Sequence, residues 1–297
     1  MADHDDPFDA GHLIGHVKDA EYFEVPHAFA LDGKLKVPQI RESSEPIATV
    51  QVPIEGLVEP FDLRITKFMC LEVIGAIILV VLFVPLANKI RSGGRPMGRL
   101  WNLLEAMLLF IRDEVARPAI GKHDADKFLP FLWTVFFFVL ICNLLGMVPW
   151  AGSPTGAFAT TGALGLMTVS GVVGGGMAKM GPVGFWTGQV PHMDLPFVLA
   201  ILLKPMIFAI EVLGLFIKHF VLAVRLLANM MAGHLVLAVL IAFIAASAKS
   251  FAFVGVAPAS ILGATALSML ELFVAFLQAY IFCFLSALFI GMAVHPH

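Results

Sequence analysis

Charged and strongly polar side chains stand inside two long apolar segments towards the C-terminal end of the sequence. The first segment, FVLAVRLLANMMAGHLVLAVL, contains Arg225, and the second contains Glu271 and Gln278. A charge at the centre of a bilayer costs at least roughly 2.5–3.5 kcal/mol on insertion scales. Each of these side chains therefore requires a partner, a water-filled cavity or a function.

These side chains differ in the proton chemistry that they offer. The guanidinium of Arg225 stays protonated, so it can act as a fixed charge but is unsuited to relaying protons. The imidazole of His234 and the carboxyl group of Glu271 can take up and release protons. Taken singly, each polar side chain is also explained by a structural hydrogen bond.

Helical geometry groups several of these residues. At 100° per residue, four polar side chains of the first segment fall within about 40° of one another and form one stripe. They are Glu211, Lys218, Arg225 and Asn229. His219 lies about 120° and His234 about 180° from Arg225 on an ideal helix, so a second polar face is also open.

An antiparallel hairpin of the two segments would bring the polar residues into pairs. Glu271 and Gln278 are seven residues apart, which places them on one helix face about 10.5 Å apart along the axis. If Gln278 is level with Arg225, then His234 and Glu271 differ in depth by only about 3 Å. The hairpin therefore predicts two pairs, Arg225 with Gln278 and His234 with Glu271.

The composition shows what must position these residues. The 297-residue chain is 59% hydrophobic and 14% charged, which is too apolar for a water-soluble fold. The stretch between Lys127 and Lys179 contains no Asp, Glu, Lys or Arg and has room for two spans of roughly 20 residues. The net charge of −3 points to no nucleic acid partner. We expect an all-α integral membrane protein.

Five membrane-embedded helices fit the apolar pattern. Three have ordinary lengths, and they are expected at about 68–87, 128–148 and 155–178, with a loop at 179–196 after the third. The last two, at about 197–248 and 256–293, are too long for an upright crossing. Fifty-two helical residues would extend about 78 Å, against a hydrocarbon core of about 30 Å. These helices must bend, break or lie strongly tilted as a hairpin.

The rest of the chain is expected outside the bilayer core. Residues 1–66 contain six prolines and are predicted to form an extramembrane arm, so that residues 67–297 form the membrane domain. Residues 99–116 have an apolar face interrupted by charges and predict an interfacial amphipathic helix, or an ordinary helix that covers other parts of the protein. Basic residues concentrate in 88–127, which puts this region in the cytoplasm and the arm outside.

Three runs of the sequence resemble a known family. RLLANMMAGHL and LFVAFLQAYIF look like the two signature regions of subunit a of the F-type ATP synthase, and FLPFLWTVFFFVLICNLLGMVP matches its second span. The resemblance covers roughly residues 68–293. It implies that Arg225 is the essential stator charge facing a rotating c-ring, beside aqueous half-channels. Asn229 and Gln278 correspond to polar neighbours of that arginine.

The resemblance also implies roles for the other polar residues. His234 and Glu271 match positions that often hold a Glu/His pair in either order, here with His on the earlier helix. Asn143, Glu211 and Lys218 could line the channel or provide packing polarity. Gly146 stands where several bacterial members carry an acid, so no role for that acid carries over to this chain.

The implied assembly is a proton-translocating complex. Its partners would be the c-ring, the peripheral-stalk subunit b, the remaining ATP synthase subunits and the lipid bilayer of a bacterial inner membrane. The chain itself would be a non-catalytic subunit with no cofactor and no metal. Whether the transported ion is H⁺ or Na⁺ stays open, because the ion-binding carboxylate would lie on the ring.

Two other functions are compatible with parts of the sequence. A secondary transporter would bind a solute at broken helices near the bilayer midplane and would work alone. A purely structural anchor would tolerate Arg225→Ala. Four histidines of the arm, at 4, 12, 16 and 27, have irregular spacing and do not predict a metal site.

Overall fold

The computed structural model describes residues 20, 22–24, 34–37, 49–50, 61–62, 65–93, 98–148, 151–189, 197–248 and 250–295. Its helical elements are α2 (Lys67–Arg91), α3 (Arg99–Phe110), the π-helix η1 (Ile111–Ala116), α4 (Arg117–Ile120), α5 (Ala125–Gly146), the 3-10 helix η2 (Pro154–Gly156), α6 (Phe158–Gly188), α7 (Phe197–Ser247) and α8 (Phe253–Val294). Two antiparallel strand pairs precede them: β1 (Tyr22–Glu24) with β2 (Lys34–Lys36), and β3 (Thr49–Val50) with β4 (Phe61–Asp62). Most of the predicted arm lies outside the described residues, so its division from the membrane domain stays a prediction.

Five helices are long and apolar enough to cross a membrane: α2, α5, α6, α7 and α8. The expectation of an all-α integral membrane protein with five membrane-embedded helices is confirmed. The expected loop at 179–196 is wrong in its first part, because α6 continues to Gly188. The chain changes direction inside α6 at Gly181, which has φ 77° and ψ 161°. Glycine tolerates this backbone conformation, and Pro182 disfavours helical geometry in the residue before it.

The segment 99–116 is helical but not one regular helix. After α3, the backbone widens into the π-helix η1, where the N–H of Arg117 bonds to the carbonyl of Arg112. Pro118 follows, and proline has no N–H to continue a regular ladder. The indole Nε1 of Trp133 donates to the carbonyl of Leu108 at 3.0 Å and ties α5 to α3. Leu100, Leu103 and Phe110 are exposed, so α3 keeps the apolar surface of an interfacial helix.

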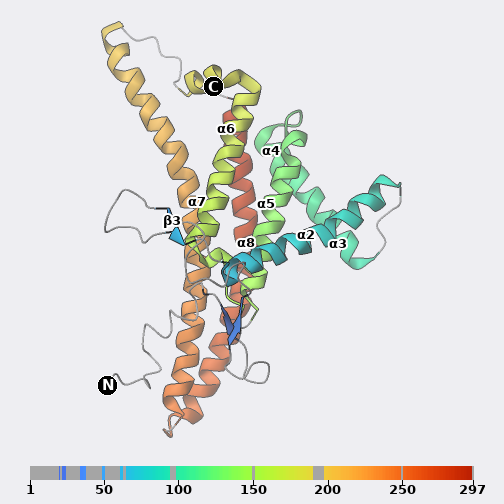
Figure 1. The fold of residues 1–297 in the computed structure, drawn as a ribbon, viewed down its shortest axis with the longest axis vertical. Helices are drawn as coiled ribbons and strands as arrows, with labels where there is room; N and C mark the ends of the chain where they lie inside the picture. The colour runs from blue at the N-terminus through green and yellow to red at the C-terminus, as the bar shows by residue number, and fades with distance from the viewer. Residues whose placement is uncertain are drawn as a thin grey trace.

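The last two helices dominate the architecture. Helices α7 and α8 run side by side as an antiparallel hairpin, and α8 also packs against α5 and α6. Figure 1 shows that α7 bends along its length and that α2 lies crosswise to the hairpin. The 51 residues of α7 would extend about 76 Å if straight. If the 25-residue α2 crosses the bilayer, the hairpin lies strongly tilted in it, as the sequence predicts.

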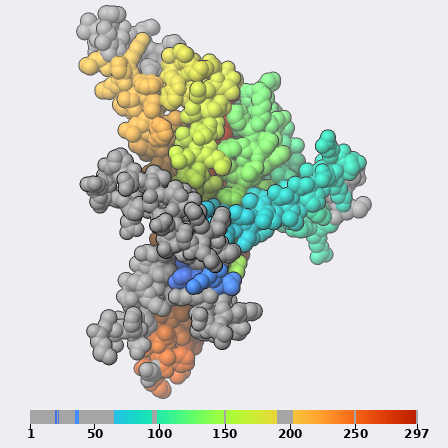
Figure 2. Space-filling model, in the orientation of Figure 1, coloured from blue at the N-terminus to red at the C-terminus, as the bar shows by residue number. Residues whose placement is uncertain are grey.

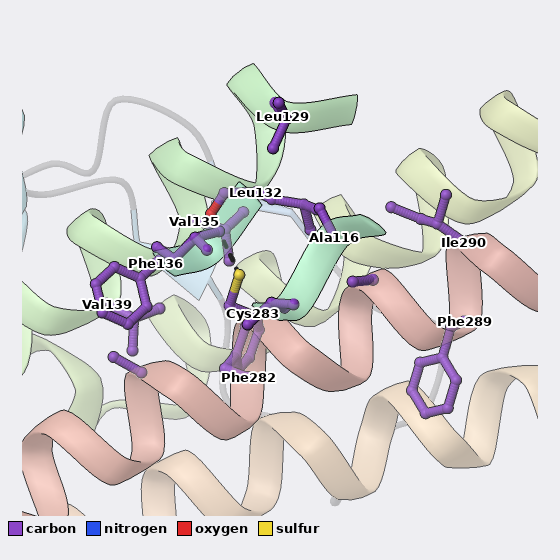
Figure 3. Close-up of a cluster of buried hydrophobic side chains, with 14 of the residues drawn as sticks. Ala116, Leu129, Leu132, Val135, Phe136, Val139, Phe282, Cys283, Phe289 and Ile290 are labelled. Atoms are coloured by element: carbon purple, nitrogen blue, oxygen red, sulfur yellow. Dashed lines mark hydrogen bonds between the residues drawn. The ribbon is translucent and has the colours of Figure 1, made fainter. Parts of the chain in front are cut away.

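The core lies between α5 and α8. Figure 3 shows Leu132, Val135 and Phe136 of α5 facing Phe282 and Cys283 of α8, and all five are buried. The Cys283 thiol lies 3.5 Å from the carbonyl oxygen of Leu132. Figure 2 shows the α7–α8 turn extending beyond this compact part at the bottom and the start of α7 extending beyond it at the upper left, with α2 and α3 projecting to one side. The core therefore fixes α8, while much of α7 stays open on one side.

One end of the helix assembly is held by ion pairs around Asp124, directly before α5. Its carboxylate accepts from Lys179 of α6 at 2.6 Å and from Lys127 of α5 at 3.2 Å. These two ammonium groups hold the pKa of the Asp124 carboxyl well below its usual range. His295 Nε2, after α8, lies 3.6 Å from the same carboxylate and 3.1 Å from the Ile120 carbonyl oxygen. The start of α5, the later part of α6 and the end of α8 thus meet at one end, which we call the Asp124 end.

Candidate functional site

The α7–α8 hairpin has a defined register at Glu271. A β-carbon built on Gly233 would lie 2.9 Å from Cδ of Glu271 and closer still to its Oε1. Nearer the turn, a β-carbon on Gly263 would lie 3.8 Å from the Leu240 side chain. Counting back along α7 and forward along α8 from Gly233 brings Gln278 to the level of Leu226. The structure therefore puts Glu271 beside the backbone that carries His234, and Gln278 level with the residue after Arg225.

The stripe on α7 divides into an exposed and a covered part. Glu211, Lys218 and Arg225 are exposed in the isolated chain, and Asn229 is half-buried. Leu222 and Leu226 lie on the covered side of α7, at 1% and 0% exposure. An exposed arginine in the middle of an apolar helix cannot face hydrocarbon cheaply. This face of α7 is therefore suited to a partner or to water.

Gln278 has a different environment from Arg225. Its side chain is 4% exposed, and its Nε2 has no hydrogen-bond partner among the residues that the structure describes. An amide nitrogen in apolar surroundings strongly favours an acceptor. The register brings Gln278 and Arg225 to one level, with Gln278 on the inside of the hairpin and Arg225 on the open side.

His234 and Glu271 are both half-buried. The Nε2 of His234 is shielded and has no partner within the described part of the chain. Together with Glu271 it gives two groups able to exchange protons at nearly one depth.

A second polar group lies where α5 approaches the hairpin. Asn143 is 0% exposed, and its Nδ2 donates to the carbonyl of Ala275 on α8 at 3.3 Å. The Thr155 hydroxyl donates to Asn143 Oδ1 at 2.8 Å, and Ser153 Oγ lies 3.0 Å from Thr155 Oγ1. The sequence analysis singled out Asn143 but neither hydroxyl, because Ser and Thr next to proline and glycine are typical of an ordinary turn.

Glu72 is a further polar group that the sequence analysis did not assign. It is the one carboxylate inside α2, and Thr160 of α6 donates its hydroxyl to Glu72 Oε1 at 2.5 Å. An acid within an apolar span was a usable signal. Near it, Lys67 is 4% exposed, and its Nζ lies 3.4 Å from the position of a β-carbon on Gly152. Polar groups thus also gather at the end of the assembly opposite the Asp124 end.

His219 belongs to the core. It is 1% exposed, its Nδ1 lies 2.8 Å from the Leu215 carbonyl oxygen, and its ring is tilted against that of Phe289, with the centroids 4.8 Å apart. The second polar face that the sequence left open therefore divides, with His219 packed inside and His234 next in sequence to Gly233, the residue that Glu271 contacts. The described residues contain no group of three or more His, Cys, Asp or Glu side chains arranged to hold a metal ion. Cys70, Cys142 and Cys283 are free thiols.

Comparison with known proteins gives this arrangement a context. Residues 69–291 match the family described as ATP synthase A chain. The chain is 43% identical over 250 residues to ATP synthase subunit a of Myxococcus xanthus. This match covers 82% of the chain and 78% of the Myxococcus xanthus protein. It is 39% identical over 254 residues to ATP synthase subunit a of Chloroherpeton thalassium, covering 84% and 72%. It is also 41% identical over 257 residues to ATP synthase subunit a 2 of Chlorobaculum tepidum, covering 84% and 69%. With about three quarters of its length inside the family match, the chain belongs to the ATP synthase A chain family.

Proposed function

We propose that this chain is the stationary proton-conducting subunit in the membrane sector of an F-type ATP synthase. It is a non-catalytic, multi-pass membrane protein, so its contribution is to move ions rather than to break a bond. The observation that carries the proposal is the position of Arg225. A permanent charge stands on the open side of a long apolar helix, level with Gln278 and about two and a half helical turns from the His234/Glu271 pair.

The open side of α7 suggests the partner. Exposed apolar side chains, including Ile210, Ile217 and Val221, flank the stripe. Facing lipid, this surface would leave the Arg225 charge unpaired in hydrocarbon. Facing the c-ring, it would set Arg225 against the ring carboxylates and hold each one ionised as it passes. Glu211 and Lys218, on the same stripe, would line the adjoining aqueous half-channel.

Proton entry and exit would use different groups. His234, Glu271, Asn229 and Gln278 would line the half-channel towards the hairpin turn, with Asn143 behind them on α5. Arg225 would separate this half-channel from the one on the Glu211 side, because a fixed positive charge repels a passing proton. A proton would then cross the membrane only while it is bound to a carboxyl group of the rotating ring.

The orientation follows from the basic residues. Lys127, Lys179 and His295 meet at the Asp124 end, and the positive-inside rule assigns that end to the cytoplasm. The hairpin turn and the arm would then lie outside a bacterial plasma membrane, with the C-terminus inside. Subunit b and the remaining ATP synthase subunits would complete the assembly around the chain.

The test is ATP-driven acidification of everted membrane vesicles that contain the whole complex. Arg225→Ala and Arg225→Gln should assemble but give no acidification, since neither keeps a positive charge. Arg225→Lys should be severely impaired, because lysine lacks the planar guanidinium and loses its proton more readily when desolvated. Acidification at the wild-type rate in Arg225→Ala would refute the proposal and would favour a structural anchor instead.

A further inference from the structure

A short chain of buried hydrogen bonds joins the loop after α5 to the backbone of α8. Its members are Ser153 at 2% exposure and Thr155 and Asn143 at 0%. The three links are Ser153 Oγ to Thr155 Oγ1 at 3.0 Å, Thr155 Oγ1 to Asn143 Oδ1 at 2.8 Å, and Asn143 Nδ2 to the Ala275 carbonyl oxygen at 3.3 Å.

The direction of this chain of hydrogen bonds follows from which groups donate. A hydroxyl group has one proton to donate, and Thr155 gives its proton to Asn143. The Ser153 hydroxyl must then be the donor to Thr155. With Oδ1 held as the acceptor, the amide of Asn143 is oriented so that its Nδ2 points at α8. Each member thus fixes the next, and such chains strengthen their own bonds.

Gly146 makes room for the first member. A β-carbon on this last residue of α5 would lie 2.5 Å from Ser153 Oγ and 2.7 Å from Ser153 Cβ. It would also lie 3.0 Å from Cε of Met230 on α7. The Ser153 hydroxyl therefore occupies the space that a side chain at position 146 would need.

The chain of hydrogen bonds ends on α8 between the two polar residues that face α7. Ala275 lies between Glu271 and Gln278 on α8, and the register puts it level with Asn229 on α7. This is midway between the His234/Glu271 level and the Arg225/Gln278 level. A shift of α8 at Ala275 would move Glu271 and Gln278 together relative to α7.

We propose that Ser153 is a positioning residue for proton transfer: its hydroxyl, admitted beside Gly146, fixes Thr155 and through it holds the Asn143 amide against α8. The inference rests on the proposed function, because it concerns the half-channel of that same pathway. It adds a residue of the loop between α5 and α6 to a site otherwise built from helices. The proposal also predicts that a hydroxyl group is needed in this space, whether position 153 or position 146 carries it.

The test exchanges the hydroxyl between the loop and α5. Ser153→Gly removes the hydroxyl, and Gly146→Ser drives a new β-carbon into Ser153. Each single variant should lower the initial rate of ATP-driven vesicle acidification, per assembled complex, about threefold to tenfold, as expected for one hydrogen bond. The double variant should regain most of the rate, because the hydroxyl from position 146 enters the space that Ser153→Gly vacates. Ser153→Ala combined with Gly146→Ser should not recover, since the alanine methyl still obstructs it.

A matched control removes a buried hydroxyl that links no helices. Thr168 is 0% exposed, and its one side-chain hydrogen bond within the described residues goes to the Gly165 carbonyl of its own helix at 2.7 Å, so Thr168→Val should pump at the wild-type rate. Wild-type pumping by Ser153→Gly, or a double variant whose two losses simply add, would overturn the inference. Arg225→Ala in the same vesicles separates the two proposals. If it is inactive while Ser153→Gly pumps normally, only the positioning role falls, and if it pumps, both fall.

Discussion

The carboxyl group of Glu271 lies against the backbone of Gly233, in the space that a β-carbon at that position would fill. This contact sets the register between the two signature helices and brings an acid next to the residue that precedes His234. A side chain larger than hydrogen at position 233 would push the carboxyl away. The absence of a side chain at Gly233 is therefore part of what positions Glu271.

Gly233→Ala should reduce proton pumping although alanine favours a helix more than glycine does. The added methyl would displace the Glu271 carboxyl, and a displacement of about 1 Å of a reacting group can cost on the order of 100-fold in rate. We expect at least about a tenfold loss in ATP-driven acidification. Gly174→Ala is the matched control, since nothing in the described structure lies within 4 Å of a β-carbon on Gly174 of α6. Equal rates in the two variants would show that the Glu271 position does not limit transport.

The topology can be tested with single cysteines in a cysteine-free background. Ser92, after α2, and His297, at the C-terminus, should react with a membrane-impermeant maleimide only from the cytoplasmic side. Phe251, which is 93% exposed in the turn between α7 and α8, should react only from the outside. Reaction of Phe251→Cys and Ser92→Cys from one and the same side would contradict the proposed crossings.

The ion pairs at the Asp124 end predict a pH-dependent stability. The pKa of the Asp124 carboxyl is lowered by Lys179 first and Lys127 second, so the folded state favours its charged form. This contribution is present above the ordinary Asp pKa of about 3.8 and is lost as the pH falls through the lower, folded-state value. Asp124→Asn should lower the melting temperature of the purified complex at pH 7, and the difference from wild type should shrink only in strong acid. A difference that vanishes already at pH 6 would assign it to another group.

The helices and their polar stripe were predictable because bilayer-spanning segments must satisfy their own backbone hydrogen bonds. The apolar runs around Phe68, Phe128 and Arg225 therefore predicted helices directly. The same periodicity predicted that Glu271 and His234 lie at nearly the same depth. In an antiparallel hairpin of two helices, only the axial register between them has to be assumed. The expected end of the third span was wrong, since the apolar run stops near Lys179 while the backbone continues through the turn at Gly181 to Gly188.

Contacts made by loops and between distant helices were not predictable in the same way. Ser153 reaches Thr155 and Asn143 only because the chain folds back past Gly146, and no periodicity encodes that return. The hydrogen bond between Thr160 and Glu72 joins two residues that are 88 positions apart in the sequence. Residue type signalled that Glu72 needed a partner, but only the packing of α2 against the start of α6 identifies it.

The last prediction concerns the order of His234 and Glu271. If these residues act as a coupled pair lining one half-channel, His234→Glu should slow proton passage, because two neighbouring carboxylates cannot both ionise freely. Adding Glu271→His restores one imidazole and one carboxyl group in the reverse order. The double variant should then pump faster than His234→Glu alone, a departure from additivity that is expected only for interacting sites. Glu271→His alone provides the other arm of the cycle, and all rates are taken per assembled complex. Because the Glu271 carboxyl lies on Gly233, the exchanged imidazole needs slightly more room there, so recovery should be partial rather than complete. Losses that simply add across the cycle would mean that the two side chains contact the pathway independently.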